Sequence, residues 1–581
     1  MKTQTFQRDL FGSFRKLVFA ISVLLCCSVG YMAQAHAQSD FKALGPDKGQ
    51  GRDDALFFPN DFEANVASKP DQNGKVLFSL CRRPPFTNSN LYTPFPANNT
   101  DAIVADTQLV MPDGTKCFYP QNEQNIVVNP TNDLNVVTSA NDYRYGLRAF
   151  VYTSKDGGHT FSDIQLPGWD PSTGAVGLFK QVQAGGDPVL TFAPDGTLYY
   201  SALVYNFSVS NQTPSGVAVA VSRDGGSTWT APVMVHYESS NNFFNDKQWI
   251  AAGQNGTVYV TWTLFKSNHP KGYLSSNIVI STSHDHGLTW SSPAPVSDAA
   301  HTVDQGSSTA VAPNGTLYVA YLSRQANDAT KHQIVLARST DGGRTFTNKE
   351  LARVYNDNAN CYPLNLAQGR FTLSFEQFRL NNFPSLAIDQ TSGQLAIVWA
   401  DDQGNAGCGG SNSTFTGVTN NQVKIITSAE GTHWSQPKTI THGADKVFPA
   451  VAMNAGKTVV GFYTRNFAPA PAMNAPLCGV GFLETTDPTY PNSPAIYDNT
   501  HSVCLDYAIS TSNDGGGTFS GETRVSNQSF NPYVMFSGSF IGDYTGVAID
   551  SRGRVYSAWT DSRGLPGTTT PNQDTVVGKG F

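Results

Sequence analysis

The sequence predicts an all-β protein assembled from one repeated unit, and three observations support this prediction. The first is composition, because the 581-residue chain has only 14% charged residues, 11% aromatic residues and 52 glycines. Disordered chains combine high charge with low hydrophobicity, and nucleic-acid-binding proteins carry a basic surface, so a net charge of −7 fits neither class. The other two observations are a strand pair and a turn sequence, each of which recurs along the chain.

The first repeat is a pair of alternating apolar runs joined by a tight turn. Clear copies are VLTFAPDGTLYYSAL (189–203) and TAVAPNGTLYVAYL (309–322). Asp-Gly and Asn-Gly tolerate the positive φ that two-residue hairpin turns require, which makes this pattern a strong hairpin signal. We expect seven such hairpins, at residues 126–140, 189–203, 249–264, 309–322, 385–400, 450–464 and 546–560.

The second repeat is the turn sequence S-x-D-x-G-x-T-[WF], which alternates with the hairpins. It occurs at residues 154–161, 222–229, 283–290, 339–346 and 512–519, with a degraded copy at 428–434. In such a turn the aspartate accepts backbone N–H groups and glycine supplies unusual φ and ψ angles. We therefore interpret Asp156, Asp224, Asp285, Asp341 and Asp514 as structural, and the alternation as one unit repeated around an axis.

These turns resemble the Asp boxes, or BNR repeats, of the sialidase superfamily of β-propellers, and the likeness covers about residues 122–565. It implies a propeller in which each box joins the third and fourth strands of a blade. We predict seven blades within residues 121–581, with six as the alternative. An open edge strand must be covered, so residues 38–120 should supply a closing strand, with 75–80 and 101–110 as candidates.

The N-terminus has the pattern of a signal peptide. A basic region that ends at Lys16 precedes an apolar run from Leu17 to Val29, and Ala35-His36-Ala37 forms a cleavage site. We predict that residues 1–37 are removed after Ala37, that the protein is secreted or periplasmic, and that no later segment spans a membrane.

Residues before the first strand and after the second strand of each unit should share one end of the propeller, opposite the turns. Charged groups gather in these segments, which predicts a polar pocket at that mouth. We expect long insertions at 348–382 and 466–505 to wall one side of it, and loop aromatics to suit sugar stacking. The catalytic candidates are Asp187, Asp246, Asp304 and Tyr544, the substrate-binding candidates are Arg324, Arg379, Arg465, Asp543 and Arg563, and the loop aromatics are Trp169, Tyr237, Phe243 and Phe244.

The resemblance implies roles for some of these residues. Sialidases bind the substrate carboxylate with three arginines, which here implies Arg324, Arg465 and Arg563. They use a tyrosine nucleophile with a glutamate partner, and an aspartate acid/base. Here the acid/base would be Asp187, Asp246 or Asp304, and the nucleophile would be Tyr544 or a neighbouring carboxylate. The family's Phe/Tyr-Arg-Ile-Pro motif is absent, and the nearest string is the sequence at residues 81–84.

Two functions are consistent with these features. The first is a secreted, monomeric, sialidase-like glycoside hydrolase (an exo-α-sialidase type of enzyme) acting on an extracellular glycan or glycoprotein. The alternative is a non-catalytic propeller that binds carbohydrate or protein. We expect no nucleic-acid partner and no cofactor. Structural calcium would suit Asp-rich loops such as Asp401-Asp402.

Six cysteines remain after removal of the leader, and an even number outside the cytoplasm predicts disulfides. Their positions in the repeat favour Cys361–Cys408 and Cys478–Cys504, which leaves Cys81–Cys117 as the third pair.

Overall fold

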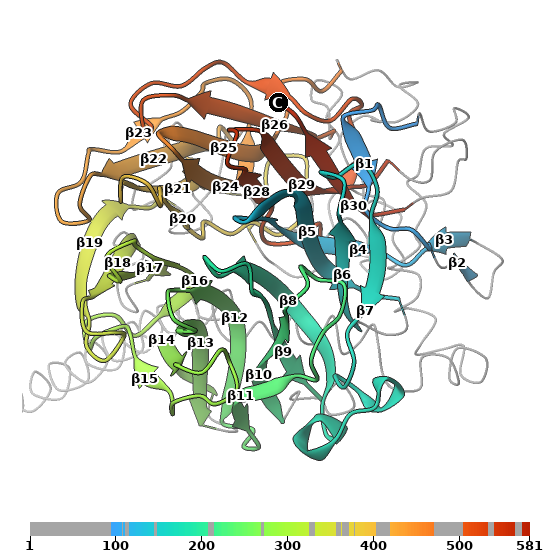
Figure 1. Cartoon of the computed structure of the whole chain (residues 1–581). Coiled ribbons are helices and arrows are strands. Elements are labelled where there is room, and N and C mark those ends of the chain that lie inside the picture. Colours follow the sequence, from blue (N-terminus) through green and yellow to red (C-terminus); the bar gives the residue numbers. More distant parts are fainter. Residues whose placement is uncertain are drawn as a thin grey trace, which may run out of the picture.

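The computed structural model describes residues 94–581, apart from residues 107, 111–115, 145–147, 207–213, 269–271, 325–331, 356–361, 363–370, 377, 403–418, 470–503, 533–539 and 564–571. Seven four-stranded antiparallel sheets surround a central axis as the blades of a β-propeller (Figure 1). In the described part of the chain, helical structure is limited to two short 3-10 turns, η1 (Pro171–Thr173) and η2 (Gly177–Lys180).

The blades follow one another in chain order, and in the first six each sheet runs from the innermost to the outermost strand. Blades 1 to 3 are formed by β4 (Gln121–Asn129), β5 (Asn132–Asp142), β6 (Arg148–Ser154) and β7 (Ser162–Gln165); β8 (Gln183–Phe192), β9 (Leu198–Tyr205), β10 (Ser215–Ser222) and β11 (Val233–Glu238); and β12 (Phe243–Ala252), β13 (Val258–Asn268), β14 (Gly272–Ser283) and β15 (Ala294–Pro295). Blades 4 to 6 are formed by β16 (Asp304–Val311), β17 (Leu317–Ser323), β18 (Gln333–Ser339) and β19 (Thr347–Arg353); β20 (Ser385–Ile388), β21 (Leu395–Asp401), β22 (Gln422–Ser428) and β23 (Lys438–Thr439); and β24 (Lys446–Asn454), β25 (Lys457–Thr464), β26 (Asp506–Ser512) and β27 (Thr523–Arg524). All seven predicted hairpins are confirmed as the two inner strands of a blade.

Blade 7 closes the ring with strands from both parts of the chain. Its order is β28 (Gly546–Ile549), β29 (Val555–Asp561), β30 (Asp574–Lys579) and then β1 (Asn99–Asp101). The predicted closure by the N-terminal segment is confirmed. The strand overlaps the candidate 101–110 at Asp101 and begins two residues earlier, and the candidate 75–80 lies outside the described residues. A further pair, β2 (Gln108–Val110) and β3 (Lys116–Phe118), forms a separate two-stranded sheet.

The core lies between adjacent blades, where apolar side chains of one sheet pack against the next. The largest buried side chains include Trp262, Trp399 and Trp559, which lie at corresponding places in the second strands of blades 3, 5 and 7. Burial of such rings is worth several kcal/mol each, at about 25 cal/mol per Å². The alternating strand pattern therefore both forms the blades and holds them together.

The Asp boxes lie on the turns between third and fourth strands, as the resemblance implies. In the box of blade 2, Asp224 Oδ1 accepts hydrogen bonds from the backbone N–H groups of Ser227 (3.0 Å) and Thr228 (2.9 Å). Its Oδ2 accepts one from the Thr228 hydroxyl at 2.7 Å. The same bonds recur around Asp156, Asp285 and Asp341. Each box aspartate thus organises its own turn.

Several sequence expectations need correction or lie beyond the described chain. Trp169 is 1% exposed and packs edge-to-face on Tyr200, so it belongs to the core and not to an open loop. The insertion before blade 5 begins after β19, because residues 347–353 form the outer strand of blade 4. Cys504 is disulfide-bonded, but its predicted partner Cys478 lies outside the described residues, as do Cys81, Cys361, Cys408 and the leader.

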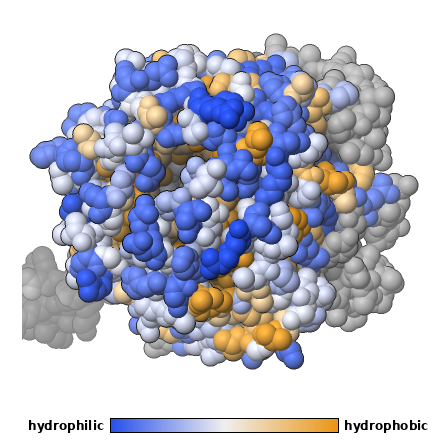
Figure 2. Space-filling view, viewed as in Figure 1, coloured by the Kyte–Doolittle hydropathy of each residue, from blue (hydrophilic) through white to orange (hydrophobic). Residues whose placement is uncertain are grey.

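The described surface carries no single large apolar patch. Its exposed large hydrophobic side chains are Val104, Leu134, Val176, Leu178, Leu274 and Leu288, which lie on several separate blades and loops. The face seen in Figure 2 is mainly hydrophilic with small scattered hydrophobic areas. Among the described residues there is no helix with the length and apolarity needed to cross a membrane.

Candidate functional site

The mouth of the channel is built from a bulge that recurs at the start of the innermost strands. In blades 1, 2, 3, 4 and 6 the register between first and second strands breaks at this point. The residue in the break has a positive φ, with values of 61° at Glu123, 54° at Asp187 and 49° at Lys247. Positive φ is rare outside glycine and costs free energy, and such strain clusters at functional sites. The bulge presents one side chain of each strand at the mouth.

The positive-φ residue of each bulge, with its equivalents in blades 5 and 7, forms a ring of seven residues around the channel. These ring residues are charged on one side of the channel and small or aromatic on the other. The side chains of Asn125, Ser308 and Ser385 each accept a hydrogen bond from a backbone N–H of the next blade. These repeated bonds show which residues occupy equivalent positions in different blades. The seven ring residues, from blade 1 to blade 7, are Glu123, Asp187, Lys247, Gly306, Phe383, Phe448 and Tyr544. Gly306 has a φ of 69°, and a Cβ there would overlap Phe383, so glycine is needed at this point.

Lys247 is the centre of the charged side. Its Nζ lies 2.9 Å from Glu123 Oε1, 3.0 Å from Asp187 Oδ2 and 2.7 Å from Asp543 Oδ2. All four side chains are at most 5% exposed. A buried charge requires compensation, so this network joins blades 1, 2, 3 and 7 by necessity.

A second cation reaches the network from the insertion before blade 5. Arg379 binds Asp543 through two hydrogen bonds, Nε to Oδ1 at 3.0 Å and Nη2 to Oδ2 at 2.7 Å. Its guanidinium also lies 4.3 Å above the Phe540 ring. Asn381 donates to the Asp543 carbonyl at 2.9 Å. The described part of the insertion therefore does border the mouth.

These surroundings shift the pKa values of the carboxyl groups in opposite directions. Burial, and then the negative charge of Asp187, raises the pKa of Glu123 well above its usual value. Burial also acts on Asp543, but Arg379 and Lys247 outweigh it and lower the pKa of that carboxyl. Burial disfavours the charge on Lys247, yet Asp187, Asp543 and Glu123 raise its pKa. Burial and like charge thus raise the pKa of one carboxyl group at the mouth, while neighbouring cations lower the pKa of another.

The aromatic side borders a small cavity. It has a volume of about 40 Å³ and is lined by Lys247, Trp249, Phe383, Phe448, Asp543 and Tyr544, among others. The Tyr544 hydroxyl donates to the Pro188 carbonyl at 3.3 Å, and its ring packs edge-to-face on Trp249. Burial, and then the charge of Glu123, raises the pKa of Tyr544, which keeps the phenol neutral.

Two of the predicted aspartates lie beside this network rather than in the ring. Asp246 precedes Lys247 and accepts a hydrogen bond from Gln305 at 3.0 Å; burial raises its pKa to about 7. Asp304 begins β16 in the next blade, and burial raises its pKa to about 7 as well. Neither residue lines the cavity.

The structure does not bring Arg324, Arg465 and Arg563 together at the mouth. Arg563 is 1% exposed and forms a bidentate pair with Asp561, at 2.9 Å (Nε–Oδ1) and 2.6 Å (Nη2–Oδ2). Arg465 pairs with Asp445 at 2.8 Å and Glu376 at 2.9 Å. Arg324 Nε lies 3.3 Å from His332 Nδ1 in its own blade. None of the three lines the cavity, so their assignment to substrate stays a prediction.

The pairing of Arg563 with Asp561 has a signal in the sequence. Asp142-Tyr143-Arg144 occupies the same place in blade 1 as Asp561-Ser562-Arg563 in blade 7. Arg144 repeats the bonds of Arg563, with Nε 3.0 Å from Asp142 Oδ1 and Nη2 2.6 Å from Oδ2. An Asp-x-Arg sequence that recurs after a second strand indicates a structural pair.

Comparison with known proteins supports the repeat family. Residues 176–406 match the model of the BNR repeat-like domain, a stretch that runs from blade 2 to blade 5 and includes three of the Asp boxes. The resemblance to Asp-box propellers is confirmed by this match. No curated protein sequence matches the chain.

Among solved structures, the Hadza microbial sialidase Hz136 has 16% identity and a TM-score of 0.37, covering 59% of this chain and 63% of that one. This chain therefore spans just under two thirds of that sialidase. The Penicillium chrysogenum α-L-arabinanase complexed with arabinobiose has 13% identity and a TM-score of 0.37, covering 64% and 94%. The Trypanosoma rangeli sialidase in complex with 2,3-difluorosialic acid has 12% identity and a TM-score of 0.36, covering 64% and 57%.

Proposed function

We propose that this BNR-repeat propeller is a sialidase-like glycoside hydrolase that acts on an extracellular glycan through carboxyl groups at the channel mouth. The observation that carries the proposal is the strained ring. Positive-φ bulges in three successive blades direct Glu123, Asp187 and Lys247 to one point, where Asp543 completes the network. Strain and buried charge are both costly, and a fold retains them together where chemistry needs them.

The chemistry that fits this arrangement is acid catalysis beside a fixed negative charge. Glycosidases commonly use two carboxyl groups, one protonated and one ionised, around an oxocarbenium-like transition state. Here Glu123, whose pKa is raised by burial and then by the charge of Asp187, would donate a proton to the leaving glycosidic oxygen. Asp543, kept ionised by Arg379 and Lys247, would stabilise the positive charge that develops on the sugar.

The aromatic side of the mouth would bind the sugar. Trp249, Phe383 and Tyr544, which line the cavity and are only half-buried, would offer ring faces and edges to the apolar face of a pyranose or furanose. In this proposal Tyr544 contributes packing rather than a nucleophilic phenol, because its hydroxyl donates to a backbone carbonyl and its proton is firmly held. The site then differs from the tyrosine-based chemistry that the sialidase resemblance implies.

The experiment is a turnover screen of the purified full chain against aryl glycosides, including a sialoside and an α-L-arabinofuranoside. On any substrate that is cleaved, Asp187→Asn should lower kcat/KM by about 100- to 10,000-fold, because it removes the carboxylate that raises the pKa of Glu123, the proposed proton donor. Tyr544→Phe keeps the ring and should stay within about tenfold of the wild type, whereas a nucleophilic tyrosine predicts a loss as large as that of Asp187→Asn.

A matched control is available in the same blade. Asp195→Asn removes one carboxylate on the β8–β9 turn at the opposite end of the blade, and asparagine already occupies that turn position at Asn255 and Asn314. It should leave turnover unchanged. If the protein binds a glycan but cleaves no substrate of the panel, the result would favour the alternative, a non-catalytic binding propeller. The observation that supports this alternative is that Lys247 and Arg379 are both paired with carboxylates.

Secretion is part of the proposal and rests on the leader sequence alone. Expression with the native N-terminus and mass measurement of the exported protein should give a chain that begins at Gln38. A full-length intracellular product would contradict it.

A further inference from the structure

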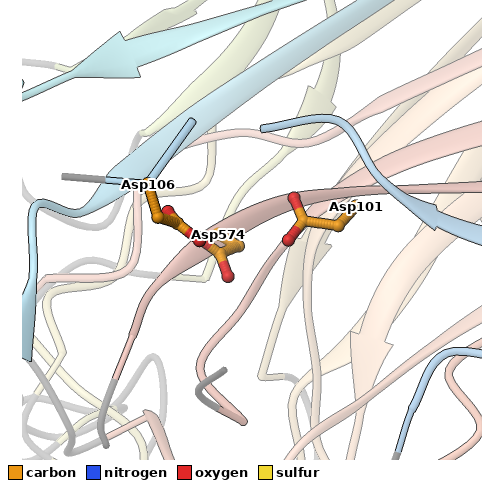
Figure 3. Close-up of side chains that lie close together, drawn as sticks. All are labelled: Asp101, Asp106 and Asp574. Atoms are coloured by element: carbon orange, nitrogen blue, oxygen red, sulfur yellow. The ribbon is translucent and has the colours of Figure 1, made fainter. Parts of the chain in front are cut away.

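The closure of blade 7 contains an acidic cluster that the proposed function does not use. Asp101 ends β1, Asp106 follows it, and Asp574 begins β30. One carboxylate oxygen from each residue lies within 4.8 Å of the others, and Figure 3 shows the three side chains grouped around one space. These residues come from the two ends of the described chain, and the blade closes where they meet.

A second observation distinguishes this cluster from an ordinary acidic surface. Asp574 is only 2% exposed, and its Oδ1 has no hydrogen-bond partner. A buried carboxylate oxygen without a donor costs free energy that a fold normally avoids. Burial, and then the charges of Asp101 and Asp106, raises the pKa of Asp574, as expected where carboxyl groups are forced together.

The nearby cations are already bound elsewhere. Arg144 lies between Asp142 at 2.6 Å and Asp163 at 2.5 Å, and Arg563 pairs with Asp561. Each arginine thus neutralises a carboxylate of its own neighbourhood. The three clustered aspartates share no salt bridge with a lysine or arginine in the described part of the chain.

The geometry points to a calcium-binding site formed by Asp101, Asp106 and Asp574 that fastens the N-terminal strand to the last strand of the propeller. Calcium binds oxygen ligands at 2.3–2.6 Å, so two oxygens on opposite sides of one ion are separated by about 4.8 Å. All three oxygens fit within that limit. Zinc would call for nitrogen or sulfur ligands, and magnesium for a smaller octahedral cage.

A calcium ion at this cluster would strengthen the short pairing between β1 and β30. β1 pairs with β30 over only three residues, Asn99 with Gly578, Thr100 with Val577 and Asp101 with Val576. The loop after β1 is also attached to blade 1, since the Val104 N–H donates to Asp163 at 3.0 Å and Arg144 donates to the Ala105 carbonyl at 3.0 Å. An ion at the cluster would therefore tie blade 7, the N-terminal segment and blade 1 together.

Calorimetric titration of the EDTA-stripped full chain with Ca²⁺ tests the proposal. We expect one ion per chain with a dissociation constant between about 1 µM and 1 mM, and a melting temperature that rises with Ca²⁺ concentration. Asp106→Asn and Asp574→Asn should each weaken binding at least tenfold, while the control Asp195→Asn should bind as the wild type does. No binding by the wild type, or equal binding by all variants, would overturn the site.

Hydrogen exchange keeps the test decisive if either variant fails to fold. In the wild-type chain, saturating Ca²⁺ should slow exchange of amides in β1 and β30 and leave the corresponding outer strands of blade 2, β10 and β11, unchanged. Uniform slowing in both blades, or none in blade 7, would contradict a calcium ion at the closure.

Discussion

At the end of the propeller that carries the Asp boxes, each aspartate is held by its own turn, whereas at the mouth the carboxylates are held by other blades. Hydrogen bonds, first of all that from the Thr289 hydroxyl, lower the pKa of Asp285 to about 2. At the mouth, burial and a neighbouring carboxylate raise the pKa of Glu123. The same type of side chain thus stabilises a turn at one end, whereas at the other end it is buried at a cost in free energy. The comparison separates an end where carboxylates stabilise their own turns from an end where burial raises their pKa, and the proposed function uses the second end.

The largest expected effect is the loss of the central cation at the mouth. Lys247→Met leaves Glu123, Asp187 and Asp543 without their shared partner and should lower the free energy of unfolding by about 3–5 kcal/mol. On the box side, Lys155 donates only to the backbone carbonyls of Asp224 and Gly225, and it is exposed. Lys155→Met should cost less than about 1 kcal/mol. If urea unfolding showed that the two variants lose the same free energy of unfolding, the proposed difference between the two ends would be contradicted.

The next effect concerns the two Asp-x-Arg pairs. Arg144→Met and Arg563→Met each leave a buried aspartate unpaired, and both should lower the free energy of unfolding by about 3 kcal/mol. Similar values would identify Arg563 as a structural residue of its blade. If Arg563→Met folded with unchanged stability and lost only substrate binding, Arg563 would belong to a substrate clamp after all.

A smaller effect is expected in the Asp boxes. Asp224→Ala removes four hydrogen bonds from an exposed turn and should cost about 1–2 kcal/mol. Turnover should remain unchanged, since the box lies at the far end of the blade from the mouth. Thermal unfolding and kcat/KM measured on the same preparation check both statements, and reduced turnover in a fully folded variant would contradict the second.

The sequence predicted the parts of this architecture that depend on local chemistry. Hairpins and boxes were recognisable because Asn-Gly turns, alternating apolar residues and the box aspartates act within a few residues. The sequence also predicted Asp187 and Asp543 at the mouth, because strand direction alternates along a blade. It could not show that Lys247 would bind Glu123 and Asp543, which are distant in sequence and meet only when the ring closes.

The other differences between the sequence predictions and the structure also arise where tertiary contacts, and not local sequence, determine the outcome. The sequence predicted that the N-terminal segment closes the ring but not the bounds of β1, because a three-residue edge strand carries almost no pattern of its own. Trp169 looked like a loop aromatic, yet tertiary packing on Tyr200 and Phe179 buries it. The bond of Arg563 to Asp561, two residues away, lies outside the predicted clamp, and the role of Arg563 in substrate binding stays a prediction.

The smallest effect is a difference in the pH dependence of stability. Burial raises the pKa of Asp246 to about 7, so its folded form binds a proton more tightly than the unfolded chain does. Its contribution to stability is therefore present below about pH 4 and is lost as the pH rises toward 7. The pKa of Asp224 is lowered, so its contribution is lost as the pH falls below about 4. Asp246→Asn should flatten the slope between pH 4 and 7 in urea titrations, and Asp224→Asn should not; the opposite pattern would contradict the assignment of the two ends.

The central claim, that the mouth donates a proton, is tested most directly by varying the leaving group. We would measure kcat/KM of the wild type and Asp187→Asn on glycosides with a poor leaving group and on the matching 2,4-dinitrophenyl glycoside, which departs without protonation. The account predicts a loss of about 100-fold or more on the first substrate and less than about tenfold on the second. Equal losses on both substrates would show that Asp187 supports only the fold or binding, and would contradict an acid catalyst at this site.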